Sequence, residues 1–294
     1  MIDDDRPRGG PLDGSRGGSA GPTNLNPGLA TYLLTHRDFM APAVASLHLP
    51  AGARVLDAGT GAGGALPALA RAATAVEGID LNPAVVPIAA AHAQRSGVGE
   101  RVTVRVGDLT EVLTEANADE PYDAIWASDV VWPGNFADPT ATVADMAAAL
   151  RPGGVIALFY SNYYRATFLP GHGRLERLIL AASELRWKLP ADGPRRHDRY
   201  LAWLLGAGFV DVRLAVLPRI GFPVDAVVRA YLESTVWPEH LASVRECGHL
   251  VGLGHADLDE VRVLLTPDSD RYVLDEPGYH VVLPAVLASG RRAP

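Results

Sequence analysis

The segment VLDAGTGAGGAL, residues 55–66, joins a buried-strand pattern to a glycine-rich loop. Gly59, Gly61 and Gly64 follow the G-x-G-x-x-G spacing, which lets a backbone turn tightly and approach a bound nucleotide closely. Asp57 comes two residues before the first glycine, where its carboxylate would repel a pyrophosphate and attract a positively charged ligand. The segment therefore predicts a nucleoside-binding loop, and Asp57 favours a cationic nucleoside over a dinucleotide.

Two further carboxylates end predicted strands downstream of this loop. Asp80 ends the run AVEGID, 19 residues after Gly61, and could accept hydrogen bonds from ribose hydroxyls. Asp108 ends the run VRVGD, where it could accept a hydrogen bond from the exocyclic amine of adenine. Taken alone, Asp80 could be a solvated acid at a strand end and Asp108 a helix cap. Together with the loop, they indicate an adenosine-based ligand.

These residues need a fold that brings strand ends to one edge of a sheet, and the chain pattern predicts one. Apolar runs alternate with helical segments, which is typical of an α/β fold with a doubly wound, mostly parallel sheet. Ligands of such sheets bind beyond the carboxyl ends of the strands. The seven predicted strands lie at residues 53–59, 75–80, 101–108, 122–129, 155–162, 210–217 and 279–288.

Local signals mark the starts of two predicted helices. Asn82 is expected to cap a helix that begins at Pro83 and ends at Gly97. Asp138 is expected to cap a helix that begins at Pro139. Both assignments follow the preference of helices for a polar cap, for proline in the first turn and for glycine after the last turn.

The composition changes along the chain predict its organisation. Residues 1–22 are rich in glycine, proline and charge and are expected to form a disordered tail. Residues 23–50 are expected to form an N-terminal helical cap, and residues 51–294 a single domain. Two segments of that domain, about 163–198 and 222–277, do not fit the strand–helix alternation. We expect them to be insertions that cover the site.

The motifs VLDAGTGAGG, GIDLNP, VRVGD, YDAIWASDVVW and LRPGGVIAL occur together in this order. In order and spacing the chain resembles the class I S-adenosylmethionine-dependent methyltransferases of small molecules, over about residues 51–216 and the closing strand. The resemblance implies a Rossmann-like methyltransferase fold with S-adenosylmethionine as cofactor and S-adenosylhomocysteine as product. It implies that Asp57 and the backbone of Gly59, Thr60, Gly61 and Gly63 hold the methionine portion, Asp80 the ribose, and Leu81, Asp108 and Leu109 the adenine, while Ser128 and Asp129 line the reactive end.

Methyl transfer from a sulfonium needs little help beyond alignment of the nucleophile and exclusion of water. A general base is needed only when the nucleophile carries a proton, as an alcohol or phenol does. The candidates for this base are His36, Asp129 and His172, and each histidine could instead be structural. We expect an SN2 transfer to oxygen or nitrogen, with proximity alone as the alternative to base catalysis.

Aromatic residues gather around the end of the fifth predicted strand, in the segment FYSNYYRATF. They are expected to line an apolar acceptor pocket, although core packing would explain them as well. If they line it, the acceptor is a hydrophobic or aromatic metabolite, as in natural-product biosynthesis. The predicted pocket residues are Tyr32, Trp132, Tyr160, Tyr163 and Tyr164.

The composition restricts partners and location. A net charge of −8 and the lack of a basic recognition module argue against nucleic acid as a partner. No apolar run approaches the roughly 20 residues of a membrane helix, and the N-terminus has no signal-peptide core. With Cys247 as the single cysteine, no intrachain disulfide can form. We therefore expect a cytoplasmic protein with no membrane partner, and a homodimer is left open.

Other readings of the sequence remain. The glycine spacing is shared with NAD(P)-dependent oxidoreductases, although Asp57 speaks against them. A non-catalytic module that binds S-adenosylmethionine would carry the same loop. No metal site is expected, because the spacing of Cys247, His249, His255 and Asp257 matches no zinc pattern.

Overall fold

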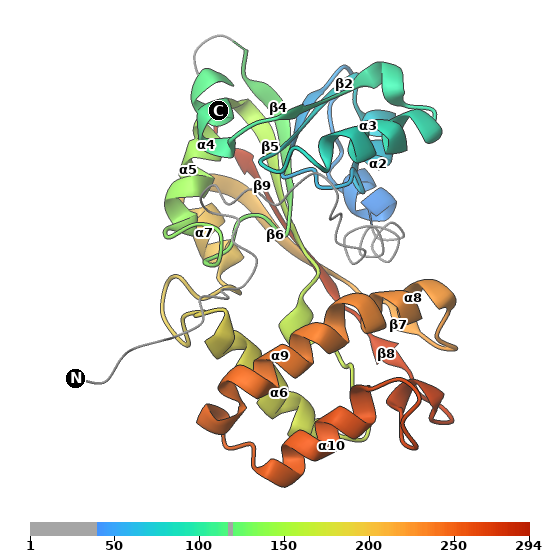
Figure 1. Ribbon diagram of the computed structural model, residues 1–294. Coiled ribbons are helices and arrows are strands. Elements are labelled where there is room, and N and C mark those ends of the chain that lie inside the picture. Colours follow the sequence, from blue (N-terminus) through green and yellow to red (C-terminus); the bar gives the residue numbers. More distant parts are fainter. Residues whose placement is uncertain (1–39, 117–119) are drawn as a thin grey trace, which may run out of the picture.

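The computed structural model describes residues 40–116 and 120–294 (Figure 1). The predicted disordered tail and most of the predicted N-terminal cap lie outside these ranges, as do Tyr32 and His36. The described end of the cap is helical from Met40 to Ala45, and its side chains at Met40, Ala43 and Val44 are buried.

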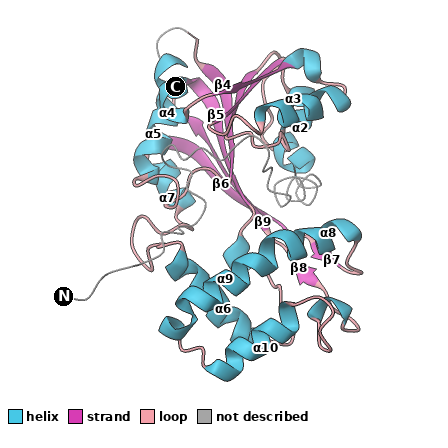
Figure 2. Cartoon of the chain, viewed as in Figure 1, coloured by secondary structure: helices cyan, strands magenta, loops and turns pink. Residues whose placement is uncertain are grey.

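A seven-stranded sheet forms the centre of the described chain, as the strand–helix alternation predicted (Figure 2). Its strand order is β3-β2-β1-β4-β5-β9-β6. The two pairings that involve β9 are antiparallel, and the other pairings are parallel. The strands are β1 (Arg54–Ala58), β2 (Ala75–Asp80), β3 (Val102–Val106), β4 (Tyr122–Ser128), β5 (Leu150–Tyr160), β6 (Phe209–Leu217) and β9 (Ala285–Arg292).

Helices cover both faces of the sheet, because successive side chains of a strand point to opposite faces. In β4, Trp126 packs with the helices of one face and Ile125 with those of the other. The first face is covered by α2 (Leu66–Ala72) and α3 (Val86–Arg95), and the second by α4 (Leu109–Ala116), α5 (Pro139–Ala149) and α7 (Tyr200–Gly206). The doubly wound prediction is confirmed.

One of the two predicted helix starts is confirmed. Asp138 caps α5 by accepting hydrogen bonds from the amides of Thr140 (3.0 Å) and Ala141 (3.3 Å). The other start was wrong, because α3 begins at Val86 instead of Pro83. The Asn82 side chain accepts a hydrogen bond from the Ala84 amide at 3.0 Å, so it closes a turn before the helix.

The last predicted strand is divided in the structure. Its first part is β8 (Val281–Val282), which pairs with β7 (Ile220–Gly221) in a separate two-stranded sheet. Its second part is β9, which enters the main sheet from Ala285 onward. Pro284 lies between them, and proline has no amide hydrogen for a strand ladder.

The two segments that broke the alternation pack on each other beyond the carboxyl edge of the sheet (Figure 1). They leave from the ends of β5 and β6 and contain α6 (Gly173–Arg186), α8 (Ala226–Tyr231), α9 (Trp237–Cys247) and α10 (His255–Leu265). A hydrophobic core of their own unites them, with Ile179, Val236 and Leu264 fully buried. We call this helical region the cover. In the described ranges, no helix is long and apolar enough to cross a membrane.

Candidate active site

The loop after β1 has a backbone that requires glycine. Gly59, Gly61 and Gly63 have φ values of +65°, +53° and +85°, in the left-handed region that favours glycine. A Cβ atom on Gly59 would lie 2.4 Å from Cγ2 of Val130, and one on Gly63 would lie 2.8 Å from the Leu66 side chain. The loop is therefore pressed against the segment after β4, and it is Gly63, not Gly64, that completes the left-handed set.

Asp57 lies buried beneath this loop and is 1% exposed. Its carboxylate accepts a hydrogen bond from the Thr60 hydroxyl at 2.6 Å. Burial, opposed by the hydrogen bond from Thr60 and aided by the nearby charge of Asp80, raises the pKa of Asp57 to about 7. A buried carboxylate with a single hydroxyl partner is a favourable neighbour for a positive charge, because the cation would replace the solvation that burial removed.

Asp80 links the end of β2 to the glycine loop. Its carboxylate accepts hydrogen bonds from the amides of Gly61 and Asn82, both at 2.9 Å. Burial raises its pKa, and the two amide bonds partly oppose that rise. The next side chain, Leu81, is apolar yet 56% exposed, as expected of a surface that a flat apolar ligand could cover. Asp80 and Leu81 therefore lie together at the carboxyl end of β2, and their contact with a nucleoside stays a prediction.

Asp108 has a structural role in the ligand-free chain. Its Oδ1 accepts a hydrogen bond from the Thr110 amide at 2.7 Å and so caps α4. Leu109, the first residue of α4, is buried. The helix-cap interpretation of Asp108 therefore holds for one oxygen, and contact of Asp108 and Leu109 with adenine stays a prediction.

The end of β4 carries two polar atoms that lack partners. Ser128 Oγ and Asp129 Oδ2 are buried without a hydrogen bond. The other Asp129 oxygen accepts from the Ser161 amide at 2.8 Å and from the Ser161 hydroxyl at 3.1 Å. Burial raises the pKa of Asp129 to about 6, and its φ of +54° is unusual for a residue other than glycine. Costly features of this kind concentrate at functional sites.

Of the predicted pocket residues, Tyr160 packs within the sheet region and Trp132 joins that region to the cover. The Tyr160 hydroxyl donates to the Val131 carbonyl at 2.7 Å, and its ring stacks on that of Tyr200 at 4.9 Å. Trp132 lies with its ring 5.5 Å from that of Trp187, at the end of α6. The Tyr160 contacts are core packing, which was the alternative explanation of the aromatic cluster, and a role of Trp132 in acceptor binding stays a prediction.

The other two described pocket residues contact the cover. The Tyr163 hydroxyl is 2.7 Å from Nδ1 of His240 in α9, and its ring meets that of Tyr164 edge-on at 5.2 Å. Tyr164 in turn lies 4.9 Å from the ring of His197. The first insertion is thereby joined to the second near the carboxyl end of β5. A role of these tyrosines in acceptor binding stays a prediction.

The structure places His172 away from the loop carboxylates. It precedes α6 and lies within electrostatic reach of Glu260 of α10. The neighbouring Arg174 pairs with Asp257 of the same helix. Figure 1 shows α10 at the end of the cover that is farthest from the sheet. His172 as a base stays an untested prediction, and Asp129 is the candidate that lies beside the glycine loop.

Two residues of this region had no signal in the sequence. His240 is fully buried in α9 and meets Tyr163. Burial raises the pKa of Tyr231 at the end of α8, and the nearby charge of Asp129 raises it too. Both come from the second insertion, in segments without a recognisable motif. Only the fold shows that they belong near the site.

Of the clustered Cys247, His249, His255 and Asp257, the last is engaged by other partners. Asp257 accepts a hydrogen bond from the Gly254 amide at 3.0 Å and pairs with Arg174. Among the described residues, no group of three or more potential ligands is arranged to hold a metal ion.

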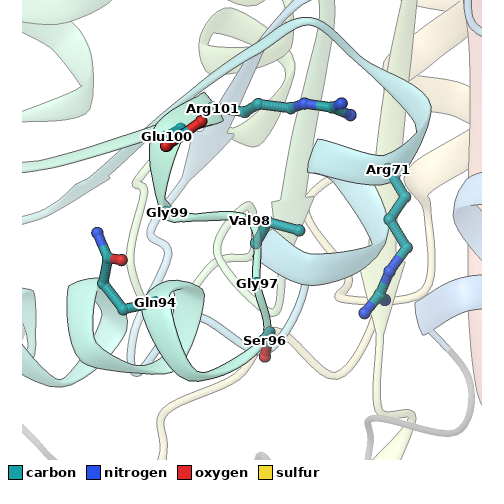
Figure 3. Close-up of a pocket in the computed structure, with 8 residues that line it drawn as sticks. All are labelled: Arg71, Gln94, Ser96, Gly97, Val98, Gly99, Glu100 and Arg101. Carbon is teal, nitrogen blue, oxygen red and sulfur yellow. The ribbon is translucent and has the colours of Figure 1, made fainter.

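A surface pocket lies elsewhere, as Figure 3 shows. It is formed by the end of α2 and by the connection from α3 to β3, so it opens at the amino edge of the parallel strands. The carboxylates described above lie at the opposite edge, and the pocket is no part of their site. Its lining residues are Arg71, Gln94, Ser96, Gly97, Val98, Gly99, Glu100 and Arg101.

Comparison with known proteins agrees with this geometry. Residues 55–154 match the family model of the methyltransferase domain. The chain is 32% identical over 165 residues to a ubiquinone biosynthesis O-methyltransferase of Xanthomonas axonopodis pv. citri, covering 54% of this chain and 63% of that protein. The chain thus spans less than two thirds of the length of this relative.

Two solved structures share the fold. One is phosphoethanolamine N-methyltransferase 2 of Haemonchus contortus, with a TM-score of 0.52, 15% identity and coverage of 92% of this chain and 58% of that one. The other is the YcgJ protein of Bacillus subtilis, with a TM-score of 0.50, 18% identity and coverage of 88% and 100%. Residues 55–154 thus match the methyltransferase domain, and the chain is similar in sequence and fold to S-adenosylmethionine-dependent methyltransferases of class I. The oxidoreductase alternative is not favoured.

Proposed function

We propose that the protein transfers the methyl group of S-adenosylmethionine to an oxygen atom of a small, predominantly apolar acceptor. The observation that carries this proposal is the buried Asp57 beneath a glycine loop whose backbone leaves no room for side chains. This arrangement fits a cationic nucleoside and disfavours a diphosphate. The name of the Xanthomonas relative supports oxygen as the methylated atom, and nitrogen is the second candidate.

The residues present fit the cofactor. Asp57 and the loop backbone would hold the methionine portion, Asp80 the ribose, and the exposed Leu81 one face of the adenine. When bound, S-adenosylmethionine supplies a methyl group that its sulfonium has already activated. The chain therefore has to hold the acceptor in line, exclude water and remove a proton.

Asp129 is the residue that we assign to proton removal. Ser161 fixes one carboxylate oxygen with two hydrogen bonds, which leaves Oδ2 as the free proton acceptor. A pKa of about 6 keeps Asp129 ionised at neutral pH, yet makes it a stronger base than a solvated aspartate. The contact between Gly59 and Val130 sets the segment of Asp129 directly against the cofactor loop.

The experiment has two steps. Calorimetry with S-adenosylmethionine, S-adenosylhomocysteine, NAD⁺ and NADP⁺ should show binding of the first two alone. Incubation with methyl-labelled cofactor and small-molecule extracts should then transfer label to an organic product. Binding of a dinucleotide in place of S-adenosylhomocysteine would refute the proposed class. Cofactor binding without any transfer would favour the non-catalytic module.

We further propose that the protein acts in the cytoplasm on a freely diffusing acceptor, without nucleic-acid or membrane partners. The acidic composition supports this. Whether it forms a homodimer is decided by light scattering of the purified chain.

A further inference from the structure

Four titratable side chains connect the sheet to the cover. Asp129 follows β4, Tyr163 follows β5, Tyr231 ends α8 and His240 lies in α9. Asp129 accepts two hydrogen bonds from Ser161, two residues before Tyr163, and the Tyr163 hydroxyl is 2.7 Å from His240 Nδ1. Burial raises the pKa of Tyr231, and the charge of Asp129 raises it too, which places Tyr231 within electrostatic reach of Asp129. These residues form one continuous group, which we call the bridging cluster.

The bridging cluster contains buried atoms without partners at both ends. At the sheet end this atom is Asp129 Oδ2, with Ser128 Oγ beside it in the chain, and at the cover end it is His240 Nε2. A buried polar atom without a partner is costly, and native proteins retain few of them. A ligand with polar groups at both ends would satisfy these atoms, which explains why the fold keeps them.

The surroundings of His240 restrict the charge of such a ligand. The imidazole is fully buried, with the rings of Phe168, Tyr163 and Trp237 at 5.3, 5.7 and 5.8 Å. Burial lowers the pKa of His240 to about 3, so the ring stays neutral at any working pH. The bridging cluster holds no lysine or arginine, and its one carboxylate opposes an anion. Of the charged groups near its tyrosines, Glu239 is also an acid, and Arg186 is already paired with Glu239 at 2.8 Å. An acceptor with a carboxylate or phosphate would find no counter-charge in the bridging cluster.

The helix that carries two of these residues has an unusual turn. Residues Leu232–Val236, between α8 and α9, form a π-helical turn. In an uninterrupted α-helix, Tyr231 and His240 would point about 180° apart, since they are nine residues from each other. The wider π-turn rotates less per residue and brings the two toward one side. Turns of this kind are frequent at functional sites.

We propose that Tyr231 and His240 of the second insertion complete the acceptor site with Asp129, and that the acceptor is an uncharged molecule with two polar groups. One is a hydroxyl that faces Asp129 and is methylated. The other exchanges a hydrogen bond with His240 Nε2. The acceptor oxygen forms the new C–O bond, its proton passes to Asp129, and the electrons of the broken C–S bond stay on sulfur. This inference rests on the proposed methyl transfer.

Three phenols of similar size and different charge test it. Tyrosol is uncharged and carries a second hydroxyl, 4-hydroxyphenylacetate is an anion, and tyramine is a cation. We expect the full-length protein to methylate tyrosol with the highest kcat/KM of the three. His240→Gln and Tyr163→Phe should each lower that value roughly tenfold, mainly through KM, and leave the Kd of S-adenosylmethionine unchanged. With 4-ethylphenol, which lacks the second hydroxyl, His240→Gln should have little effect.

Two variants serve as matched controls. Ser243→Ala removes a buried hydroxyl from α9 that already bonds Glu239 at 2.9 Å, and His249→Gln changes an exposed histidine of the cover. Both should keep the wild-type kcat/KM for tyrosol. If His240→Gln does not fold, as judged by circular dichroism, Tyr231→Phe takes its place.

Several outcomes would overturn the inference. They are preference for the anion or the cation, an unchanged kcat/KM in the His240 and Tyr163 variants, and cofactor binding without methylation of any of the phenols. Failure of the wild-type protein to bind S-adenosylmethionine would instead refute the proposed function itself, so the two failures are distinguishable.

Discussion

Asp57 shows how a single residue can favour ligand binding and disfavour stability. Its folded-state pKa of about 7 lies above the usual 3.8, so the folded chain holds a proton more tightly than the unfolded chain does. Stability therefore falls as pH rises from about 4 to 7, because the carboxylate ionises freely in the unfolded chain but at a free-energy cost when it is buried. Above pH 7 the full free-energy cost of the buried, ionised carboxylate is present, unless a bound cation compensates it.

Asp57→Asn should separate these two effects. Without ligand at pH 8, we expect the variant to gain on the order of 3 kcal/mol in the free energy of unfolding, and the gain should fade toward pH 4. Binding of S-adenosylmethionine should weaken roughly a hundredfold, since a charge-assisted contact is lost. Urea unfolding at several pH values and calorimetry measure both. Asp145→Asn, on the exposed side of α5, is the control. A stability loss at pH 8 would contradict the assignment.

Asp129 should give the reaction its pH dependence. Because its pKa lies at about 6, protonation below that value removes the proton acceptor, and kcat should rise with pH through about 6 and then level off. Asp129→Asn can keep the two hydrogen bonds from Ser161 through its amide oxygen, so we expect it to fold. It should lower kcat about a hundredfold or more and abolish the inflection. An unchanged profile in the variant would leave proximity as the mechanism.

Some residues of this site could be predicted from the sequence, and others could not. Asp57 and Asp80 were predicted from their spacing to the glycines, and the structure places both beside the loop, because β1 and β2 are neighbours in the sheet. His240 could not be predicted, because it contacts Tyr163, which is 77 residues earlier in the chain, and no sequence pattern in α9 indicates that contact. His172 shows the converse, since its residue type suggests catalysis while the fold places it beside α10.

At the scale of elements, the loop between β1 and α2 depends on backbone shape more than on side chains. Gly59→Ala would place a Cβ atom 2.4 Å from Val130 Cγ2 at a residue whose φ is +65°. Strain and clash together should cost about 3 kcal/mol or more and abolish cofactor binding. Thermal unfolding and binding of S-adenosylhomocysteine measure the two effects.

Gly153 offers a matched comparison for this loop. Its φ is +76°, yet a Cβ atom there would meet nothing within 4 Å. Gly153→Ala should therefore cost only the backbone strain of about 1 kcal/mol and leave cofactor binding intact. Equal losses of stability and of cofactor binding in Gly59→Ala and Gly153→Ala would show that the contact with Val130 contributes nothing.

Element boundaries were predictable where a side chain determines them. Asp138 accepts two amide hydrogen bonds, and α5 begins where its cap predicted. Asn82 carries an equally good capping side chain but uses it to close a turn, so α3 begins later. The division of the last strand into β8 and β9 was not predictable, because β8 pairs with β7, about 60 residues earlier in the chain.

At the scale of the whole molecule, the chain forms two cores on the sheet and a third within the cover. The sequence showed that two segments interrupt the fold but could not show that they pack together. Their contacts join distant residues, as where the Tyr279 hydroxyl donates to the Phe168 carbonyl at 2.8 Å across 111 residues. Asp57 and Asp80, the proposed cofactor ligands, belong to the sheet, while Tyr231 and His240 belong to the cover.

This division between sheet and cover predicts that single substitutions can weaken cofactor binding and acceptor binding separately. Leu264 is fully buried in the core of the cover, and Leu264→Ala should cost about 2–5 kcal/mol there. Since Asp57, Asp80 and the glycine loop contact none of that core, we expect the affinity for S-adenosylhomocysteine to stay within about threefold, while methylation of tyrosol falls at least tenfold. Leu56→Ala, in β1 beneath the loop, removes an equally buried leucine and should weaken cofactor binding as well. Calorimetry with S-adenosylhomocysteine and initial rates of tyrosol methylation are measured on both variants. If Leu264→Ala lost cofactor affinity together with methylation, sheet and cover would fold as one cooperative unit.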